Sequence, residues 1–285
     1  MKLAMENFEL YLRFGDEASI KMIKNAGFDA IDYSFYNECS GDEVLGEGYI
    51  AHAEAVKALL DKEGLVCNQA HAPFDLKYGD VLDMSNEKFV KLVRSMEAAS
   101  IMGAEHIIVH SISVPSDIDV VEYNVGFYNA LVPYCEKFGI KVAIENLFDY
   151  DAKCDCYRGK IHTAKMLYDI LDRLNSEWFV ICIDVGHAAI VGVEPDELIR
   201  GLDSKVLKAL HIHDNDYKSD AHLFSYHGKI DWDKVCDALK EIGYDGDFTL
   251  EVMLQLARYE DGFMQEAVCY AGKIGRRLIE KIECE

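Results

Sequence analysis

The amino-acid sequence predicts a (β/α)8 barrel, the TIM-barrel fold, built as a single domain over residues 1–285. Short apolar segments that suit strands alternate with longer amphipathic segments that suit helices, which indicates parallel strands joined by helical crossovers. Eight such units follow one another without a break in composition, and eight repeats that close on themselves form a barrel. A doubly wound open sheet is the competing architecture. It is disfavoured because no G-x-G-x-x-G sequence follows the first predicted strand.

The predicted strands are short and apolar, and many are rich in β-branched or aromatic residues, as strands covered on both faces are. In chain order they are Phe8–Phe14, Phe28–Phe35, Leu65–Ala70, His106–Val109, Lys141–Ile144, Phe179–Ile183, Val206–Leu210 and Phe248–Leu250.

The predicted helices lie between these strands, and most carry a start or stop signal. In chain order they cover residues 16–22, 52–62, 85–100, 121–138, 163–174, 194–202, 231–242 and 262–282. Ser85 and Asp231 are expected to be N-caps, and Pro195 is expected at the first position of its helix. Glycines that suit the end of a helix follow at Gly27, Gly64, Gly103, Gly139 and Gly243.

Composition and charge narrow the classes of partner. Half of the residues are hydrophobic and only four are proline, so a large core is feasible. The net charge of −22 disfavours nucleic acid, because binding phosphates requires neutralising cations. A small anionic substrate stays compatible, since one bound metal ion inverts the local field. No membrane partner is expected because no apolar run could span a bilayer, and no N-terminal targeting segment is recognised, so the expected location is the cytoplasm.

The nine cysteines are scattered and odd in number, and several lie in apolar runs, which is typical of reduced, buried thiols. Cys154 and Cys156 form a C-D-C sequence in the loop after the fifth strand. They lack partners at a metal-ligand spacing and are interpreted as ordinary loop composition. The sequence leaves the oligomeric state open, with a homodimer as one option.

Carboxylates and imidazoles follow the carboxyl ends of six predicted strands. The sixth strand, for example, runs through I-C-I-D-V-G-H, so that an apolar segment leads directly into Asp184 and His187. The complete set is His71, His110, Glu145, Asp184 with His187, His211, and Glu251. Barrel enzymes hold their chemistry at this rim. Acidic groups crowded there without arginines would repel one another, which predicts a bound divalent cation; Mn, Co, Mg or Zn suits these ligands.

The segment 211–232 contains four histidines and four aspartates in 22 residues, a composition that suits neither a helix nor a strand. On a structural interpretation it is a polar surface loop that ends in the N-cap Asp231. On a functional interpretation it forms the lid and wall of the pocket, where His222 and His227 contact substrate or a second metal ion.

The acid/base chemistry is assigned to Glu145 and Glu251, which are expected on opposite sides of the barrel with a small substrate between them. A divalent ion polarises a carbonyl and its adjacent hydroxyl, which makes the intervening proton easier to remove. One carboxylate takes that proton and the other can return it, so that a sugar isomerises or epimerises through a cis-enediolate. The alternative is that both carboxylates are ligands only.

Several motifs together resemble the xylose-isomerase-like barrel superfamily, which includes sugar phosphate isomerases/epimerases, ketohexose 3-epimerases, hydroxypyruvate isomerase, inosose dehydratase and endonuclease IV. These motifs are H-A-P-F at 71–74, I-I-V-H at 107–110, I-E-N at 144–146, I-D-V-G-H at 183–187, H-I-H-D at 211–214, D-A-H…H-G-K-I-D-W from 220, and L-E-V at 250–252. The resemblance covers essentially the whole chain.

Resemblance to the epimerase branch implies one divalent ion, Mn in the first place, held by Glu145, Asp184, His211 and Glu251. Resemblance to endonuclease IV implies that further positions match a three-zinc site, namely His71, His110, Asp220 and His222. These four residues and His187 are assigned here to substrate binding. The chain departs from the ketohexose 3-epimerases at Tyr217, close to where they carry an arginine that grips the sugar.

The predicted activity is therefore that of a metal-dependent isomerase or epimerase acting on a sugar or sugar phosphate. The alternatives are a metal-dependent lyase or dehydratase on a keto-sugar or keto-cyclitol, and a zinc phosphoesterase of the endonuclease IV type.

Overall fold

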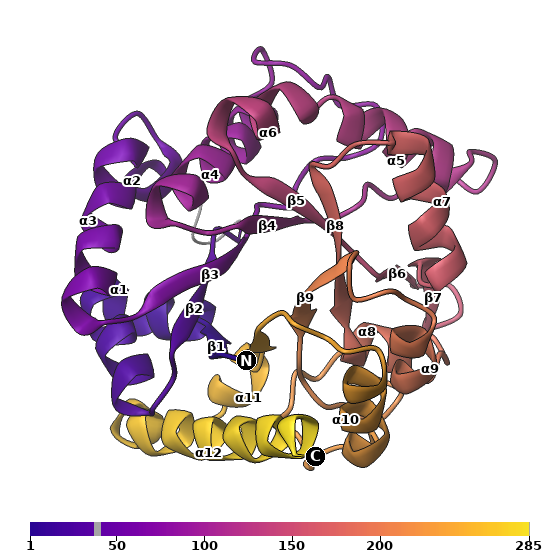
Figure 1. The fold of residues 1–285 in the computed structure, drawn as a ribbon. Coiled ribbons are helices and arrows are strands. Elements are labelled where there is room, and N and C mark those ends of the chain that lie inside the picture. Colours follow the sequence, from indigo (N-terminus) through magenta and orange to yellow (C-terminus); the bar gives the residue numbers. More distant parts are fainter. Residues whose placement is uncertain (37–40, 285) are drawn as a thin grey trace.

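Eight parallel strands form one ring with helices around it, in the order β10–β1–β2–β3–β4–β5–β8–β9 (Figure 1). The computed structural model describes residues 1–36 and 41–284. The ring strands are β1 Leu3–Glu6, β2 Ala30–Ser34, β3 Val66–His71, β4 His106–Val109, β5 Lys141–Glu145, β8 Phe179–Asp184, β9 Leu207–His211 and β10 Phe248–Leu250. The predicted (β/α)8 barrel is confirmed.

The ring closes between β9 and β10. Ile212 pairs in parallel with Leu250, and the Ile212 amide donates to the carbonyl oxygen of Thr249 at 2.9 Å. The Glu251 amide donates in turn to the Ile212 carbonyl oxygen at 3.1 Å. Closure satisfies backbone groups that an open sheet would expose at its edges.

Helices cover the outside of the ring, and α12 lies beside α1 and α10 (Figure 1). The helices are α1 Phe8–Asn25, α2 Asp42–Leu45, α3 Tyr49–Glu63, α4 Glu87–Met102, α5 Val120–Asn129, α6 Val132–Phe138, α7 Ala164–Leu174, α8 Val185–Ile190, α9 Pro195–Arg200, α10 Trp232–Glu241, α11 Met253–Leu256, the 3-10 turn η1 Asp261–Phe263, and α12 Met264–Glu283. No helix in the described part of the chain is both long and apolar enough to cross a membrane.

The first predicted strand is wrong. Residues 8–14 are helical, and Arg13 Nε lies 2.6 Å from Glu9 Oε1 one turn earlier. The true first strand is the fully buried Leu3–Glu6. Gly15 interrupts the helical dihedral angles of α1 with φ 72°, so a helical segment does begin at Asp16 as expected. A short apolar run rich in leucine and aromatics fits a strand or a buried helix equally well, which explains the error.

Helix ends follow the predicted signals with two corrections. Gly64, which follows α3, is left-handed with φ 68°, as a C′ glycine should be. The N-cap of α4 is Asn86 rather than Ser85, because the Asn86 side chain accepts the Lys88 amide at 3.0 Å. The predicted helix 121–138 is two helices. Its second part begins next to Pro133, whose missing N–H cannot continue the preceding helical bonding.

A two-stranded hairpin, β6 Leu147–Asp151 with β7 Cys156–Ile161, follows β5 and was not predicted. A disulfide joins Cys154 to Cys156 at its tip, which corrects the interpretation of these cysteines as ordinary loop composition. Other described cysteines are free thiols, whereas Cys39 lies outside the described residues.

The side-chain alternation of the strands carries the functional residues into the barrel. A small buried cluster comprises Ile108, Ala143, Val180, Cys182 and Ala209. Strand side chains on one face recur every second residue. His110, Glu145, Asp184 and His211 each lie two residues after a member of this cluster. The apolar cluster therefore forms a floor, and the polar side chains extend the same interior face toward the rim.

Candidate metal centre

Four side chains at or directly after the ends of four strands converge at the carboxyl end of the barrel. Ligand atoms of Glu145, Asp184, His211 and Glu251 all lie within 4.8 Å of one another, and all four residues are buried. His211 Nδ1 is 2.6 Å from Glu145 Oε1, 3.4 Å from Glu251 Oε2 and 4.0 Å from Asp184 Oδ2. The structure thus brings together the four residues predicted as ligands, while their role stays a prediction.

The remaining predicted site residues form two groups beside these four. His71 and His110 face each other with their Nε2 atoms 3.0 Å apart, and His110 Nε2 lies 2.8 Å from Glu145 Oε2. On the other side, His187, Asp220 and His222 gather with a further histidine, with ligand atoms again within 4.8 Å. That further residue is His213. His213 lies two residues after His211. Side chains two residues apart along an extended segment point to the same face, so this spacing is the sequence signal that could have predicted His213.

Three of these histidines are oriented by main-chain carbonyls. His71 Nδ1 donates to Ala72 O at 2.8 Å, and His187 Nδ1 donates to Asn146 O at 3.1 Å. His222 Nδ1 donates to Glu251 O at 3.0 Å. A carbonyl oxygen only accepts, so Nδ1 carries hydrogen in each case and Nε2 is the atom presented to the neighbouring groups. This fixed orientation is typical of histidine ligands of metals.

His211 is oriented the opposite way by a carboxylate that sequence reasoning missed. Asp32 Oδ2 lies 3.2 Å from His211 Nε2, and Gln69 donates to the same oxygen at 2.7 Å. Asp32 therefore engages Nε2 and leaves Nδ1 toward Glu145 and Glu251. A carboxylate behind a ligating histidine fixes its tautomer and raises its basicity.

The donor set fits a divalent cation. Glu251 Oε2 and Asp220 Oδ1 are buried, and no donor in the described residues forms a hydrogen bond with either. Unpaired carboxylate oxygens in a buried position are costly unless a cation binds them. Carboxylate and imidazole ligands suit Mn, Co, Mg or Zn, as the sequence predicted.

Electrostatics keep the two glutamates ionised. Burial alone would raise the pKa of Glu251, but His211 and His222 outweigh it and lower the pKa to about 2. Burial also opposes ionisation of Glu145, yet His211 and His110 hold its pKa well below the usual value. For His222 burial would lower the pKa, whereas Asp220 and Glu251 raise it to about 10. In the metal-free protein a proton on His222 thus offsets part of the negative charge.

Binding of Mn²⁺ at pH 7 is expected to release protons. The raised pKa of His222, about 10, means that its side chain is protonated in the metal-free protein at pH 7, and a divalent ion bound in the adjacent four-residue centre repels that proton. The apparent Mn²⁺ affinity should therefore increase as pH rises from 7 toward 10. Calorimetric titration in buffers of different ionisation enthalpy counts the released protons. His222→Ala should reduce that number by about one, whereas His227→Ala should not change it.

The structure corrects two further expectations. His227 is exposed, lies away from the centre and approaches Tyr270 Oη at 3.4 Å. Glu145 and Glu251 are not on opposite sides of the barrel, since only β8 and β9 separate their strands in the ring. They approach a common His211 nitrogen instead.

A pocket of about 300 Å³ opens above the centre. Its lining combines rim residues with side chains that the sequence analysis missed, Tyr36 and Lys160 among them. Tyr36 Oη donates to Glu251 Oε1, so this tyrosine holds the carboxylate in place. Lys160 is the one lysine or arginine among the described residues that line this pocket. Its Nζ donates to Ser111 O at 2.9 Å and Ser113 Oγ at 3.2 Å, which ties β7 to the segment after β4.

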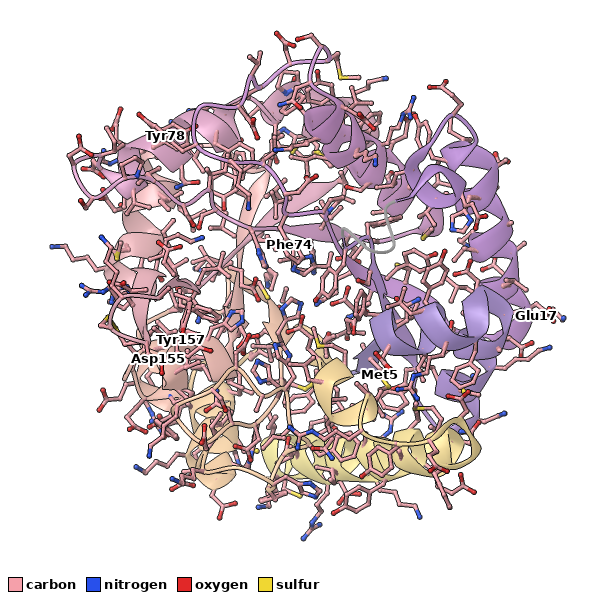
Figure 2. All side chains as sticks on the ribbon, turned by 180° about the vertical axis from the view of Figure 1, so that it is seen from behind. Met5, Glu17, Phe74, Tyr78, Asp155 and Tyr157 are labelled. Carbon is pink, nitrogen blue, oxygen red and sulfur yellow. A yellow bond between two sulfur atoms is a disulfide. The ribbon has the colours of Figure 1, made fainter. Side chains whose placement is uncertain are left out.

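Phe74, which follows β3, lies over the middle of the ring in the view from behind (Figure 2). It stacks on His110 with ring centroids 4.8 Å apart and meets Tyr36 edge-on at 5.3 Å. These rings form an apolar wall beside the carboxylates and shield them from water, which strengthens electrostatic interactions inside the pocket.

Comparisons with known proteins agree with this architecture. An uncharacterized protein of Methanocaldococcus jannaschii is 28% identical over 244 residues, which cover 82% of this chain and 78% of that protein. A D-tagatose 3-epimerase-like protein has a TM-score of 0.76 at 24% identity, covering 99% of this chain and 98% of its own. These matches extend over nearly the whole barrel.

Two further solved structures share the fold. The IolI protein with a bound zinc atom has a TM-score of 0.70 at 19% identity, covering 99% of this chain and 98% of its own. The 3-keto-D-glucoside 4-epimerase YcjR from E. coli has a TM-score of 0.72 at 18% identity, covering 97% of this chain and 99% of its own. Finally, the family model described as xylose isomerase-like TIM barrel matches residues 20–265, and the chain therefore belongs to that family.

Proposed function

We propose that this protein is a divalent-metal-dependent isomerase or epimerase that moves a proton next to the carbonyl group of a sugar or sugar phosphate. The observation that carries the proposal is the meeting of two buried carboxylates, Glu145 and Glu251, at one histidine nitrogen below a small pocket. The epimerases of the same fold support the reaction class, and the zinc bound by the IolI protein supports the proposal that a divalent metal ion binds here.

Glu145, Asp184, His211 and Glu251 would hold the ion, with Mn as the first candidate. When bound, a divalent ion polarises the substrate carbonyl and the adjacent hydroxyl. One ionised glutamate accepts the proton from the carbon beside the carbonyl, and the other acts with it in returning a proton. Return of the proton to the neighbouring carbon isomerises the sugar. Delivery to the opposite face by the other carboxylate, after that group has taken a proton from water, inverts the carbon.

Deuterium exchange tests this reaction directly. Mn-loaded protein incubated in deuterated water with ketoses, keto acids and keto-glycosides should label the carbon next to the carbonyl, because a carboxylate exchanges its proton with solvent before returning it. Proton NMR detects the lost signal. Exchange with no member of this panel would contradict the proposal. An enone product would instead indicate the lyase alternative, in which the same proton abstraction expels a leaving group.

One observation favours a second candidate, a zinc phosphoesterase. Besides the four-residue centre, two further clusters stand next to it: His71 with His110 and Glu145, and the group of His187, His213, Asp220 and His222. Three neighbouring clusters could hold three ions and activate water for phosphate ester hydrolysis. Metal analysis of zinc-loaded protein separates the candidates, since about three ions per chain with activity on a phosphodiester would favour the phosphoesterase.

A further inference from the structure

A second, larger pocket of about 730 Å³ adjoins the pocket above the metal centre. We call the two the outer pocket and the inner pocket. The outer pocket is lined by the β6–β7 hairpin, by Ile190 of α8 and by the segment 217–220. Phe148 and Asp220 line both pockets, so the two pockets adjoin at these residues.

Aromatic rings connect the two pockets. Tyr150 lies 5.3 Å from Tyr157 between ring centroids, and Tyr157 meets Phe148 edge-on at 4.9 Å. Phe148 in turn meets His187 edge-on at 4.9 Å, next to the metal centre. Tyr217 completes the aromatic lining from the other side. In the view from behind, Tyr157 lies beside Asp155 at one side of the barrel, away from Phe74 over the middle of the ring (Figure 2).

These rings are placed for a ligand rather than for the core. Tyr150 is 52% exposed. Phe148, Tyr157 and Tyr217 are partly buried, and a cluster of aromatic rings that line a pocket next to a buried polar site is typical of a binding surface. Aromatic faces carry partial negative charge and attract the partly positive C–H face of a sugar ring or the edge of another aromatic ring.

The charges around the outer pocket indicate a neutral ligand. Its described lining contains Lys218 as a cation and Asp155 and Asp220 as anions. Tyr150 Oη already donates to Asp155 Oδ1 at 2.5 Å, and Tyr217 Oη donates to Glu194 at 3.2 Å. A phosphate group would lack the several cations that it requires, as would a nucleic-acid strand.

We propose that the outer pocket binds a second ring of the substrate, so that the protein acts on glycosides. The reacting keto-sugar occupies the inner pocket, and the glycosidic partner, a second sugar or an aromatic aglycone, stacks on Tyr150 and Tyr157. This proposal rests on the proposed function for the identity of the reacting unit. The preference for a two-ring ligand over a one-ring ligand is a property of binding, so it can be measured without turnover.

Calorimetric binding of phenyl β-D-glucopyranoside, cellobiose and methyl β-D-glucopyranoside to the Mg-loaded protein tests the proposal. One of the two-ring ligands should bind about tenfold more tightly than the methyl glycoside, as one stacking contact provides. A preference for cellobiose identifies a sugar as the second unit, whereas a preference for the phenyl compound identifies an aromatic aglycone.

Tyr150→Ala and Tyr157→Ala should each remove most of this preference, because each removes a ring on which the second unit stacks. Tyr150 is half exposed, so its replacement does not endanger folding. The matched control is Tyr78→Ala, which removes a tyrosine of similar exposure, 45%, that lines neither pocket. Equal affinities of the one-ring and two-ring ligands, or an unchanged preference in both variants, would overturn the proposal. A retained preference without deuterium exchange on any keto-glycoside would overturn the reaction instead.

Discussion

Glu251→Gln is expected to reduce deuterium exchange by about 10²–10⁴-fold, the contribution of a positioned general base. Glutamine keeps the size of the side chain and can still accept the hydrogen bond from Tyr36, but it cannot take a proton from carbon. The experiment measures the exchange rate at saturating Mn²⁺, together with bound Mn²⁺ per chain, so that lost chemistry is distinguished from lost metal.

Glu145→Gln should have an effect at least as large, because Glu145 contributes ligand atoms both to the four-residue centre and to the cluster with His71 and His110. The double variant should be little worse than either single one, since groups that act as a unit are not additive. The matched control is Glu105→Gln, which removes an exposed glutamate beside β4 at the opposite end of the barrel. Full exchange by Glu251→Gln with metal bound would refute the acid/base role and leave Glu251 as a ligand only.

Removal of divalent metal is expected to abolish exchange and to lower thermal stability. An ion that binds only the folded chain stabilises it by about 2.7 kcal/mol at a hundredfold excess over its Kd. For a protein of 285 residues that amount corresponds to a fall of about 4–5 °C in Tm after chelation. Calorimetric melting before and after treatment with a chelator, followed by addition of Mn²⁺, measures both effects.

The control for this experiment is Asp184→Asn, which weakens one ligand in the centre. Its Tm should respond less to Mn²⁺ than that of the unchanged protein. If chelation changes neither the exchange rate nor the Tm, although metal analysis shows that the ion has been removed, the ion has no part in the reaction or in the fold.

Strand ends were the part of the site that could be predicted from the sequence. Six of the predicted strands run into a carboxylate or an imidazole, and parallel strands of a barrel end at one rim, so the convergence of Glu145, Asp184 and His211 follows from the order of the strands. Eight strand–helix units predict a closed ring, and closure of the ring brings Glu251 of the last unit to the other three ligand candidates. Helix ends could also be predicted from local signals. Gly64 ends α3 with a left-handed backbone conformation, and Asp231 caps α10 because its side chain accepts a hydrogen bond from the Lys234 amide.

The residues that were missed depend on tertiary structure. Asp32 lies in β2, which is buried throughout, so no alternation of polar and apolar residues marks the face that meets His211. Lys160 belongs to a hairpin whose pairing has no strong turn signal, and its partners come from a distant segment. Phe8–Phe14 was assigned to a strand because an apolar run of this length suits either element.

Crystals of Mn-loaded protein offer the most direct test, through the anomalous scattering of the ion. The account predicts a strong anomalous peak bounded by Glu145, Asp184, His211 and Glu251, with Asp32 behind the histidine. A map from fully loaded protein that shows no peak among these four side chains, or a peak elsewhere on the molecule, would contradict it.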